Sequence, residues 1–188
     1  MGLALRAYFY CDFRDSKKQD SSGLLSSFLA QLAAKSNACF DILSALYSDC
    51  GAGTPQPSDD ALLGCLEKML NIERLPIIYI IIDGLDECPN APGVKPPLER
   101  VLEVVENLVN FRLSNVRICA TSRPEADIQA SLAPLACHKT SLHDEDGQKK
   151  DIRKYVRSIV YSDRRMRRWG VDNQEMVIDN LSQRDGGM

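Results

Sequence analysis

Residues 77–88 read IIYIIIDGLDEC, in which six apolar positions run directly into a cluster of acids. The apolar run lacks polar alternation, so it predicts a strand over residues 75–82 in the middle of a parallel sheet, with helices on both faces. The acids are Asp83, Asp86 and Glu87. Ligands bind beyond the carboxyl ends of the strands in open parallel sheets, so the same stretch predicts the place of a site.

The segments around this strand alternate between strand and helix patterns. Further strands are expected over residues 6–13, 116–122 and 137–142. Helices are expected over residues 23–35, 39–49, 98–111, 123–132 and 173–183, with another starting at Ser58. Residues 144–168 also carry apolar side chains at helical spacing, with a basic opposite face. Ser21 or Ser22 is expected to cap the first helix, and Pro124 to lie in a first turn. Gly- and Pro-rich loops are expected over residues 51–60 and 88–97. This order predicts an α/β fold with a parallel sheet flanked by helices.

The composition is that of an ordinary globular protein. The chain has 188 residues, of which 44% are hydrophobic and 26% charged, and its net charge is −3. This charge favours neither nucleic acid nor an anionic membrane as a partner. No apolar run approaches the roughly 18–20 residues that a membrane helix needs. We therefore expect a cytoplasmic protein with no nucleic-acid or membrane partner.

Cysteine and histidine are placed in a way that argues against a zinc site. The seven cysteines are widely spaced without a C-x-x-C pair, and there are only two histidines. A structural zinc site needs four clustered ligands, which this spacing does not offer. We expect no zinc, and reduced thiols that are mostly buried.

Arg123 follows the strand that begins at Val116, and it joins the acids if the two strands are neighbours. Mg²⁺ takes one or two carboxylates and keeps several waters. A second acid can orient an attacking water, and a guanidinium can contact a terminal phosphate. The plainer alternative is that Asp83 and Gly84 form a turn and that Asp86 caps the next element. Crowded carboxylates repel one another unless a cation lies between them. A site for Mg²⁺ and a nucleotide is therefore favoured over a simple turn.

With these residues in place, the sequence resembles the NACHT-type P-loop NTPases of the STAND class. It is most similar to the fungal NACHT and nephrocystin-like N-terminal domains of NLR-like proteins. IIYIIIDGLDEC is similar to their Walker B segment. Residues 7–32 resemble the strand and helix that follow the phosphate loop in these proteins. Residues 116–125 resemble their sensor-1 strand, and residues 142–156 resemble the entry to their helical lid. The resemblance implies a partial NTPase core over residues 1–143 and the truncated start of a helical lid over residues 144–188.

The resemblance also implies roles for the site residues. Asp83 would hold Mg²⁺, directly or through water, and Arg123 would sense the γ-phosphate. Asp86 is the first candidate for the acid that positions water, and Glu87 the second. The family binds ATP or GTP with Mg²⁺, and it couples the nucleotide state to self-association through the NTPase domain and to signalling.

One expected motif does not occur in the sequence. The phosphate loop G-x-x-x-x-G-K-[ST] would supply the backbone cradle, a phosphate-binding Lys and a Mg²⁺-binding Ser or Thr. The chain therefore resembles an internal fragment, for which we expect little or no NTP hydrolysis. The alternative is a non-catalytic interaction module that retains the NTPase fold. Nucleic-acid binding through RRMRRWG at residues 164–170 is a third possibility, and a solvated lid surface is favoured over it.

Overall fold

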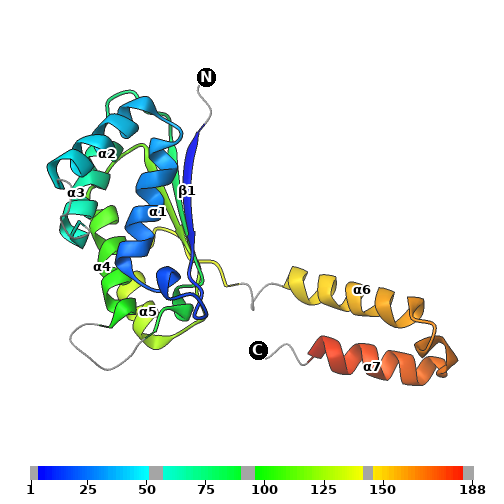
Figure 1. The fold of residues 1–188 in the computed structure, drawn as a ribbon. Helices are drawn as coiled ribbons and strands as arrows, with labels where there is room; N and C mark the ends of the chain where they lie inside the picture. The colour runs from blue at the N-terminus through cyan, green and yellow to red at the C-terminus, as the bar shows by residue number, and fades with distance from the viewer. Residues whose placement is uncertain (1–3, 51–56, 90–95, 142–145, 184–188) are drawn as a thin grey trace. The chain divides into compact units, whose positions relative to one another are not determined.

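A computed structural model of the chain describes residues 4–50, 57–89, 96–141 and 146–183 (Figure 1). The chain divides into two compact units, Met1–Ala136 and Cys137–Met188. Parts of the two expected loops and of the expected lid entry lie outside the described residues. Each unit is described by itself below.

The first unit is built on a parallel sheet of three strands. These are β1 (Leu5–Tyr10), β2 (Ile78–Asp83) and β3 (Val116–Ala120), in the spatial order β1-β2-β3. In the middle of the sheet, Ile81 is paired with Tyr8 on one side and Cys119 on the other. The predicted α/β fold and the central place of the isoleucine-rich strand are both confirmed.

Only one face of this sheet is covered by helices within the described part of the first unit. Ile78, Ile80 and Ile82 of β2 are fully buried, whereas Tyr79 on the opposite face is 45% exposed. The same alternation continues on β1, where Phe9 is buried beside exposed tyrosines. The prediction of helices on both faces is therefore wrong for this unit. Consecutive isoleucines hide the alternation because they are apolar on the exposed face as well.

The helices of the first unit lie on the covered face of the sheet (Figure 1). They are α1 (Ser21–Ala33), α2 (Asn37–Cys50), α3 (Asp59–Leu70), α4 (Pro97–Asn110) and α5 (Ala126–Leu132). Phe28 of α1, Leu66 of α3 and Val101 of α4 are fully buried in the core. Their regular apolar spacing is what predicted these helices from the sequence.

The outer edge of β1 is covered by one side chain of α1. The side-chain amide of Gln31 donates to Tyr8 O at 2.7 Å and accepts from Tyr8 N at 3.1 Å. It thus satisfies the two backbone groups that a neighbouring strand would bond. Among the described strands, β1 lies at this edge of the sheet.

Two predicted helix starts differ in the structure. Asp20 caps α1 by accepting a hydrogen bond of 2.7 Å from Gly23 N, so the expectation of Ser21 or Ser22 is wrong. Ser21 is instead buried, and its hydroxyl donates to a carboxylate of α3. Pro124 lies ahead of α5 and outside its first turn. α3 begins next to Ser58, where a helix start was predicted, and Ser58 is its cap.

The strand predicted over residues 137–142 is wrong for its described residues, 137–141, which are not in a strand. A strand needs a neighbour with which to form its ladder of hydrogen bonds. β3 pairs with β2 at one edge, and no described strand pairs with its other edge. The described residues of the segment are mostly polar, so few apolar side chains favour its burial.

The second unit is a helical hairpin. It consists of α6 (Asp146–Ser162), the short 3₁₀ helix η3 (Met166–Arg168) and α7 (Val171–Gln183). Val160 of α6 and Ile178 of α7 are its buried apolar residues. Among the described residues of both units, no helix has the length and apolar character needed to cross a membrane.

Candidate functional site

The carboxyl edge of the sheet collects the residues predicted from the sequence. β2 ends at Asp83 and continues through Gly84 into the 3₁₀ helix η2 (Leu85–Glu87). β3 is the neighbour of β2 and continues towards Arg123. The condition for a shared site is therefore met, and the three acids and Arg123 lie at one edge.

Gly84 turns the chain back over this edge. Its φ is +71°, a left-handed conformation that costs other residues about 1–2 kcal/mol. A Cβ at this position would lie 3.6 Å from Cys11 O, so the backbone conformation, not lack of space, favours glycine. The next residue, Leu85, is fully buried and donates a backbone hydrogen bond of 3.0 Å to Thr121 O. The turn is thus anchored to β3.

Asp83 is oriented by Thr121, which follows β3. The hydroxyl of Thr121 donates to the Asp83 carboxylate and accepts a hydrogen bond of 3.1 Å from Gly84 N. Sequence reasoning missed Thr121. The only available signal was its place as the first hydroxyl residue after the apolar run of β3.

Asp86 and Arg123 are bound to each other. The Asp86 carboxylate accepts from Arg123 N at 2.9 Å and lies 3.3 Å from Arg123 Nε. The carboxylate side chain is 12% exposed and the arginine side chain 67% exposed. Because the ion pair uses Nε, the end of the guanidinium is open to solvent. Asp86 therefore positions Arg123, and the alternative in which it caps the next element along the chain is wrong, because neither η2 nor α4 has a side-chain cap.

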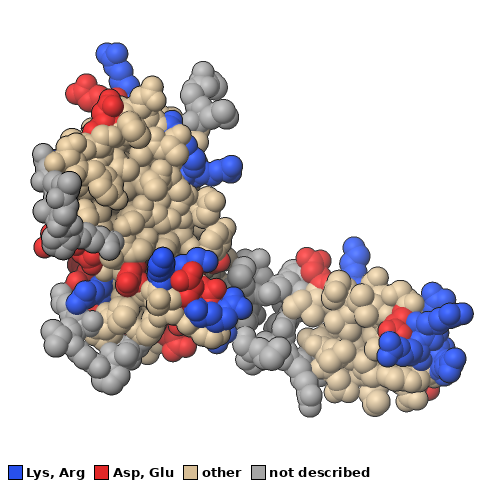
Figure 2. Space-filling model, viewed as in Figure 1, with Lys and Arg blue, Asp and Glu red and all other residues tan. Residues whose placement is uncertain are grey.

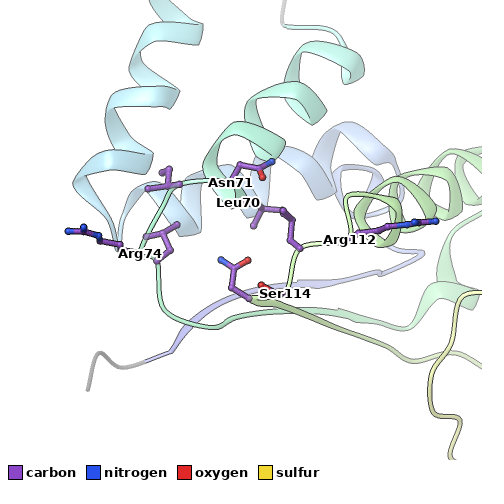
Figure 3. A pocket seen from close by; sticks show the side chains of 9 residues that line it. Leu70, Asn71, Arg74, Arg112 and Ser114 are labelled. Atoms are coloured by element: carbon purple, nitrogen blue, oxygen red, sulfur yellow. The ribbon is translucent and has the colours of Figure 1, made fainter.

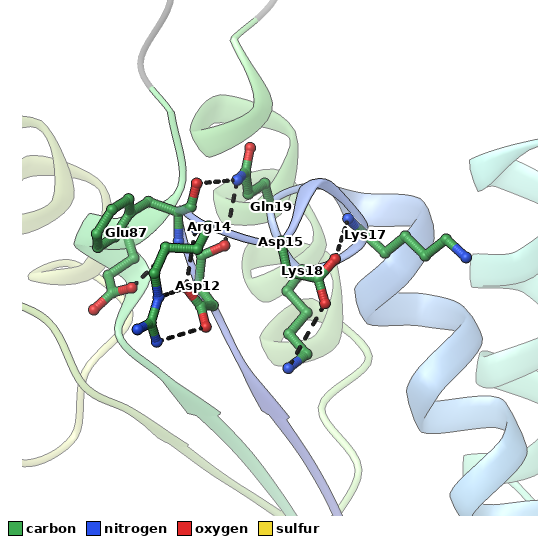
Figure 4. A network of polar contacts seen from close by, with 8 residues as sticks. Asp12, Arg14, Asp15, Lys17, Lys18, Gln19 and Glu87 are labelled. Carbon is green, nitrogen blue, oxygen red and sulfur yellow. Dashed lines mark hydrogen bonds and ion pairs between the residues drawn. The ribbon is translucent and has the colours of Figure 1, made fainter.

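Glu87 turns in the opposite direction, towards β1. Its carboxylate accepts a hydrogen bond of 3.3 Å from Phe13 N, in the loop that follows β1. In the same loop, Arg14 binds Asp12 through Nε at 2.9 Å and through Nη2 at 3.0 Å (Figure 4). The hydrogen bond from Arg14 lowers the pKa of Asp12 to about 2. Sequence reasoning missed this pair, because an acid and a base two positions apart are common in loops.

The loop after β1 is tied together by its own polar groups. Gln19 donates to Phe13 O at 2.6 Å and to Asp12 O at 3.3 Å. Asp15 accepts from Lys17 N at 3.1 Å and caps the 3₁₀ helix η1 (Ser16–Lys18) (Figure 4). These contacts hold Phe13 N where Glu87 meets it.

A pair of buried thiols lies beside the acids. Cys11 follows β1 and Cys88 follows η2, and their side chains hydrogen-bond to each other. This hydrogen bond and burial raise the pKa of Cys11 far above its ordinary value. Cys39 and Cys65 are also buried, so the described thiols are free and mostly buried, as predicted.

The three acids do not form a ready-made metal cage. Among the described residues, no group of three or more His, Cys, Asp or Glu is placed to hold a metal ion. Asp83 faces β3 through Thr121, whereas Glu87 faces the loop after β1. The donor set thus fits Mg²⁺ only as a site with one carboxylate, in which waters and phosphate oxygens supply the remaining ligands.

A hollow of about 390 Å³ lies at the other end of the strands, away from the acids. It is lined by the segments that enter β2 and β3, residues 70–75 and 112–115. Arg74 and Arg112 both have left-handed backbones, and their side chains point away from the hollow (Figure 3).

Comparison with known proteins gives one match. A family model described as nephrocystin 3, N-terminal, matches residues 3–123. The matched residues include all three strands and reach Arg123. No curated protein and no solved structure matches the chain.

Proposed function

The chain belongs to the nephrocystin 3 N-terminal family, and from that premise we propose that it is the partial nucleotide-binding and oligomerisation core of a NACHT-type STAND NTPase. The full-length protein would be an NLR-like signalling protein of fungal type. One observation carries the proposal: at the carboxyl edge, Asp83 is held by Thr121, which follows β3, and Arg123 is held by Asp86, which follows β2. Such an edge is where open parallel sheets bind ligands.

Asp83 is proposed as the Mg²⁺ ligand, directly or through water. The hydroxyl of Thr121 fixes the direction of the carboxylate, and Gly84 N fixes the hydroxyl. When bound, Mg²⁺ would neutralise charge on the phosphates of ATP or GTP. An Asp83→Asn substitution keeps the shape of the side chain and removes the charge that holds the ion.

Arg123 is proposed to contact the terminal phosphate. Asp86 holds its Nε, and the open end of the guanidinium supplies two further donors that suit phosphate oxygens. Asp86 remains the first candidate for the acid that positions the attacking water. Glu87, which uses one oxygen to bind Phe13 N, is the second.

The sequence contains no phosphate loop, and the proposed nucleotide binding and hydrolysis are weak for this reason. Without the backbone N–H cradle and its Lys, the edge lacks the groups that grip the β- and γ-phosphates. We therefore propose weak nucleotide binding and little or no hydrolysis for these residues alone.

The second candidate function is a non-catalytic interaction module that retains the NTPase fold. The observation that favours it is that charged side chains at the carboxyl edge form ion pairs with one another. Asp86 is committed to Arg123, and Asp12 to Arg14. These contacts need no nucleotide to hold the edge together, so the fold can persist without one.

The test compares two proteins for Mg²⁺-dependent binding of fluorescent ATP and GTP analogues. The first is the chain itself, and the second carries a phosphate-loop strand and helix start ahead of residue 4. We expect weak binding by the first and tight, Mg²⁺-dependent binding by the second, which Asp83→Asn abolishes. Tight Mg²⁺-dependent binding and turnover by the first protein would contradict the proposed need for the phosphate loop. Failure of the second protein to bind, despite native circular dichroism, would favour the interaction module.

A further inference from the structure

The turn that joins α6 and α7 is the most basic part of the second unit. Arg164, Arg165, Arg167 and Arg168 lie within five positions, and all four are exposed. Figure 2 shows Lys and Arg side chains gathered at the end of the hairpin where the two helices join. Like charges this close repel one another, so their concentration at one turn needs a reason.

The turn has a defined conformation, held by contacts with both helices. Gln174 of α7 is buried, and its side chain donates to Met166 O at 2.8 Å. Asp163 accepts from Arg165 N at 2.7 Å, and Arg167 Nε donates to Tyr161 O at 3.1 Å. The arginines are therefore presented outwards from a fixed backbone.

Apolar side chains stand beside these cations. Trp169 in the turn is 45% exposed, and Val171, the first residue of α7, is 66% exposed. An indole with one polar edge and an apolar body is suited to the boundary between water and lipid. Cations beside exposed apolar groups are also the pattern of surfaces that lie on anionic membranes.

The arginines described on the two hairpin helices are paired with acids, whereas those of the turn are not. Along the hairpin, Arg153 is paired with Asp179 at 2.7 Å, and Arg157 with Glu175 at 2.8 Å. None of the four turn arginines forms an ion pair with another described residue. A single strand of nucleic acid would need a basic track with successive aromatic platforms, and here acids flank the track. A short cationic end with two apolar side chains fits a flat anionic surface better.

We propose that residues 164–171 form a contact point for a membrane surface rich in anionic lipid headgroups. The arginines bind headgroup phosphates and carboxylates, and Trp169 and Val171 enter the interfacial layer. The contact is peripheral and reversible, because each basic residue adds only a modest attraction that salt screens. It concerns the second unit, so it stands or falls independently of the nucleotide site.

Trp169 is the only tryptophan in the chain, so its fluorescence reports on this turn alone. The full chain is mixed with vesicles of phosphatidylcholine containing phosphatidylserine, and with vesicles of phosphatidylcholine alone. We expect a blue shift of the emission and co-sedimentation with the anionic vesicles only, both reduced by added salt. Inorganic phosphate and a short single-stranded oligonucleotide are tested in parallel.

Two variants sharpen the test. Replacing Arg165 and Arg168 together by Gln should weaken vesicle binding roughly 25-fold, since each basic residue near an anionic surface contributes about fivefold. Lys154→Gln is the matched control, because Lys154 is exposed on α6 away from the turn. Vesicle binding by this variant should change much less than binding by the double arginine variant. Circular dichroism checks that the variants keep their helices.

The proposal is overturned if anionic vesicles neither shift the emission nor carry the chain down. It is also overturned if the oligonucleotide alone quenches Trp169, which would identify nucleic acid as the partner. An equal shift with inorganic phosphate would indicate a site for free phosphate instead of a membrane surface. Equal loss of binding in the double variant and in Lys154→Gln would show that the turn has no special role.

Discussion

The carboxyl edge of the sheet and the turn of the helical hairpin are both rich in charge, but they use it differently. At the edge, Asp86 holds Arg123, and Asp12 holds Arg14 as Figure 4 shows, so charged groups fix one another in place. At the turn, the arginines face solvent, and apart from the hydrogen bond from Arg167 Nε to Tyr161 O the backbone is held by other groups. The charged side chains of the edge thus have ion-pair partners to lose when one is replaced, whereas the turn arginines have none among the described residues. Stability should respond to substitutions at the edge, and ligand binding to substitutions at the turn.

The largest expected effect is that of Leu85→Ala at the edge. Leu85 is fully buried under the turn that carries the acids, and emptying such a site typically costs about 2–5 kcal/mol. Urea unfolding followed by circular dichroism measures the change. Leu181→Ala is the control on the second unit, because Leu181 is 54% exposed and should change stability by about 0.5 kcal/mol or less. If both variants lowered the free energy of unfolding by similar amounts, the expected difference in stability between the two regions would be wrong.

The next effect is that of Gly84→Ala, which isolates the backbone of the same turn. An alanine in the left-handed conformation should cost about 1–2 kcal/mol, although a Cβ finds enough room. Gly170→Ala is a matched control at the hairpin turn, where an added Cβ meets nothing within 4 Å and the backbone is not left-handed. Urea unfolding compares the two variants. An unchanged free energy of unfolding for Gly84→Ala would show that the backbone of the turn shifts to accommodate alanine without cost.

A smaller effect is expected for Asp86→Ala. The substitution removes the acceptor of Arg123 N and should cost about 1 kcal/mol, the usual value of one such hydrogen bond. Arg123→Gln should cost less, because the backbone hydrogen bond to Asp86 remains. The double arginine variant of the hairpin turn should change stability by about 0.5 kcal/mol or less. If the double arginine variant is the most destabilised of the three, the charged side chains of the edge do not stabilise the fold more than those of the hairpin turn.

The smallest effect concerns pH and the exposed Asp12–Arg14 pair. The pKa of Asp12 is about 2 in the folded chain, against an ordinary value of 3.8. Because the folded pKa is the lower one, the pair contributes stability above about pH 4, and the contribution is lost as the pH falls towards 2. NMR titration of the Asp12 carboxyl group measures this pKa, which Arg14→Gln should raise towards the ordinary value. An unchanged pKa in that variant would mean that Arg14 is not its cause.

Much of the edge could be predicted because its signals are local. The apolar run before Asp83 predicted a central strand, and the order of strands and helices predicted a parallel sheet. Parallel strands end at a common edge, so Arg123 and the acids were expected together. The strand predicted over residues 137–142 was wrong, because a strand also depends on a neighbour that its own sequence does not reveal.

Other features of the edge could not be read from local patterns. Nothing in the isoleucine run distinguished the buried Ile80 from its neighbour Tyr79, which faces solvent. Asp20 and Ser21 are both good caps, and the choice between them depends on a carboxylate of α3 that binds the Ser21 hydroxyl. Such choices are made by packing between distant segments.

The sequence by itself determined that a buried strand ends in a cluster of carboxylates, since the pattern of apolar residues and the glycine after Asp83 are local properties. The tertiary structure alone decided which group each carboxylate meets. Asp86 meets a residue 37 positions away and Glu87 one 74 positions away, in opposite directions. The physical reason is that side-chain direction depends on the left-handed turn at Gly84 and on the register of three strands, which form only when distant segments pair.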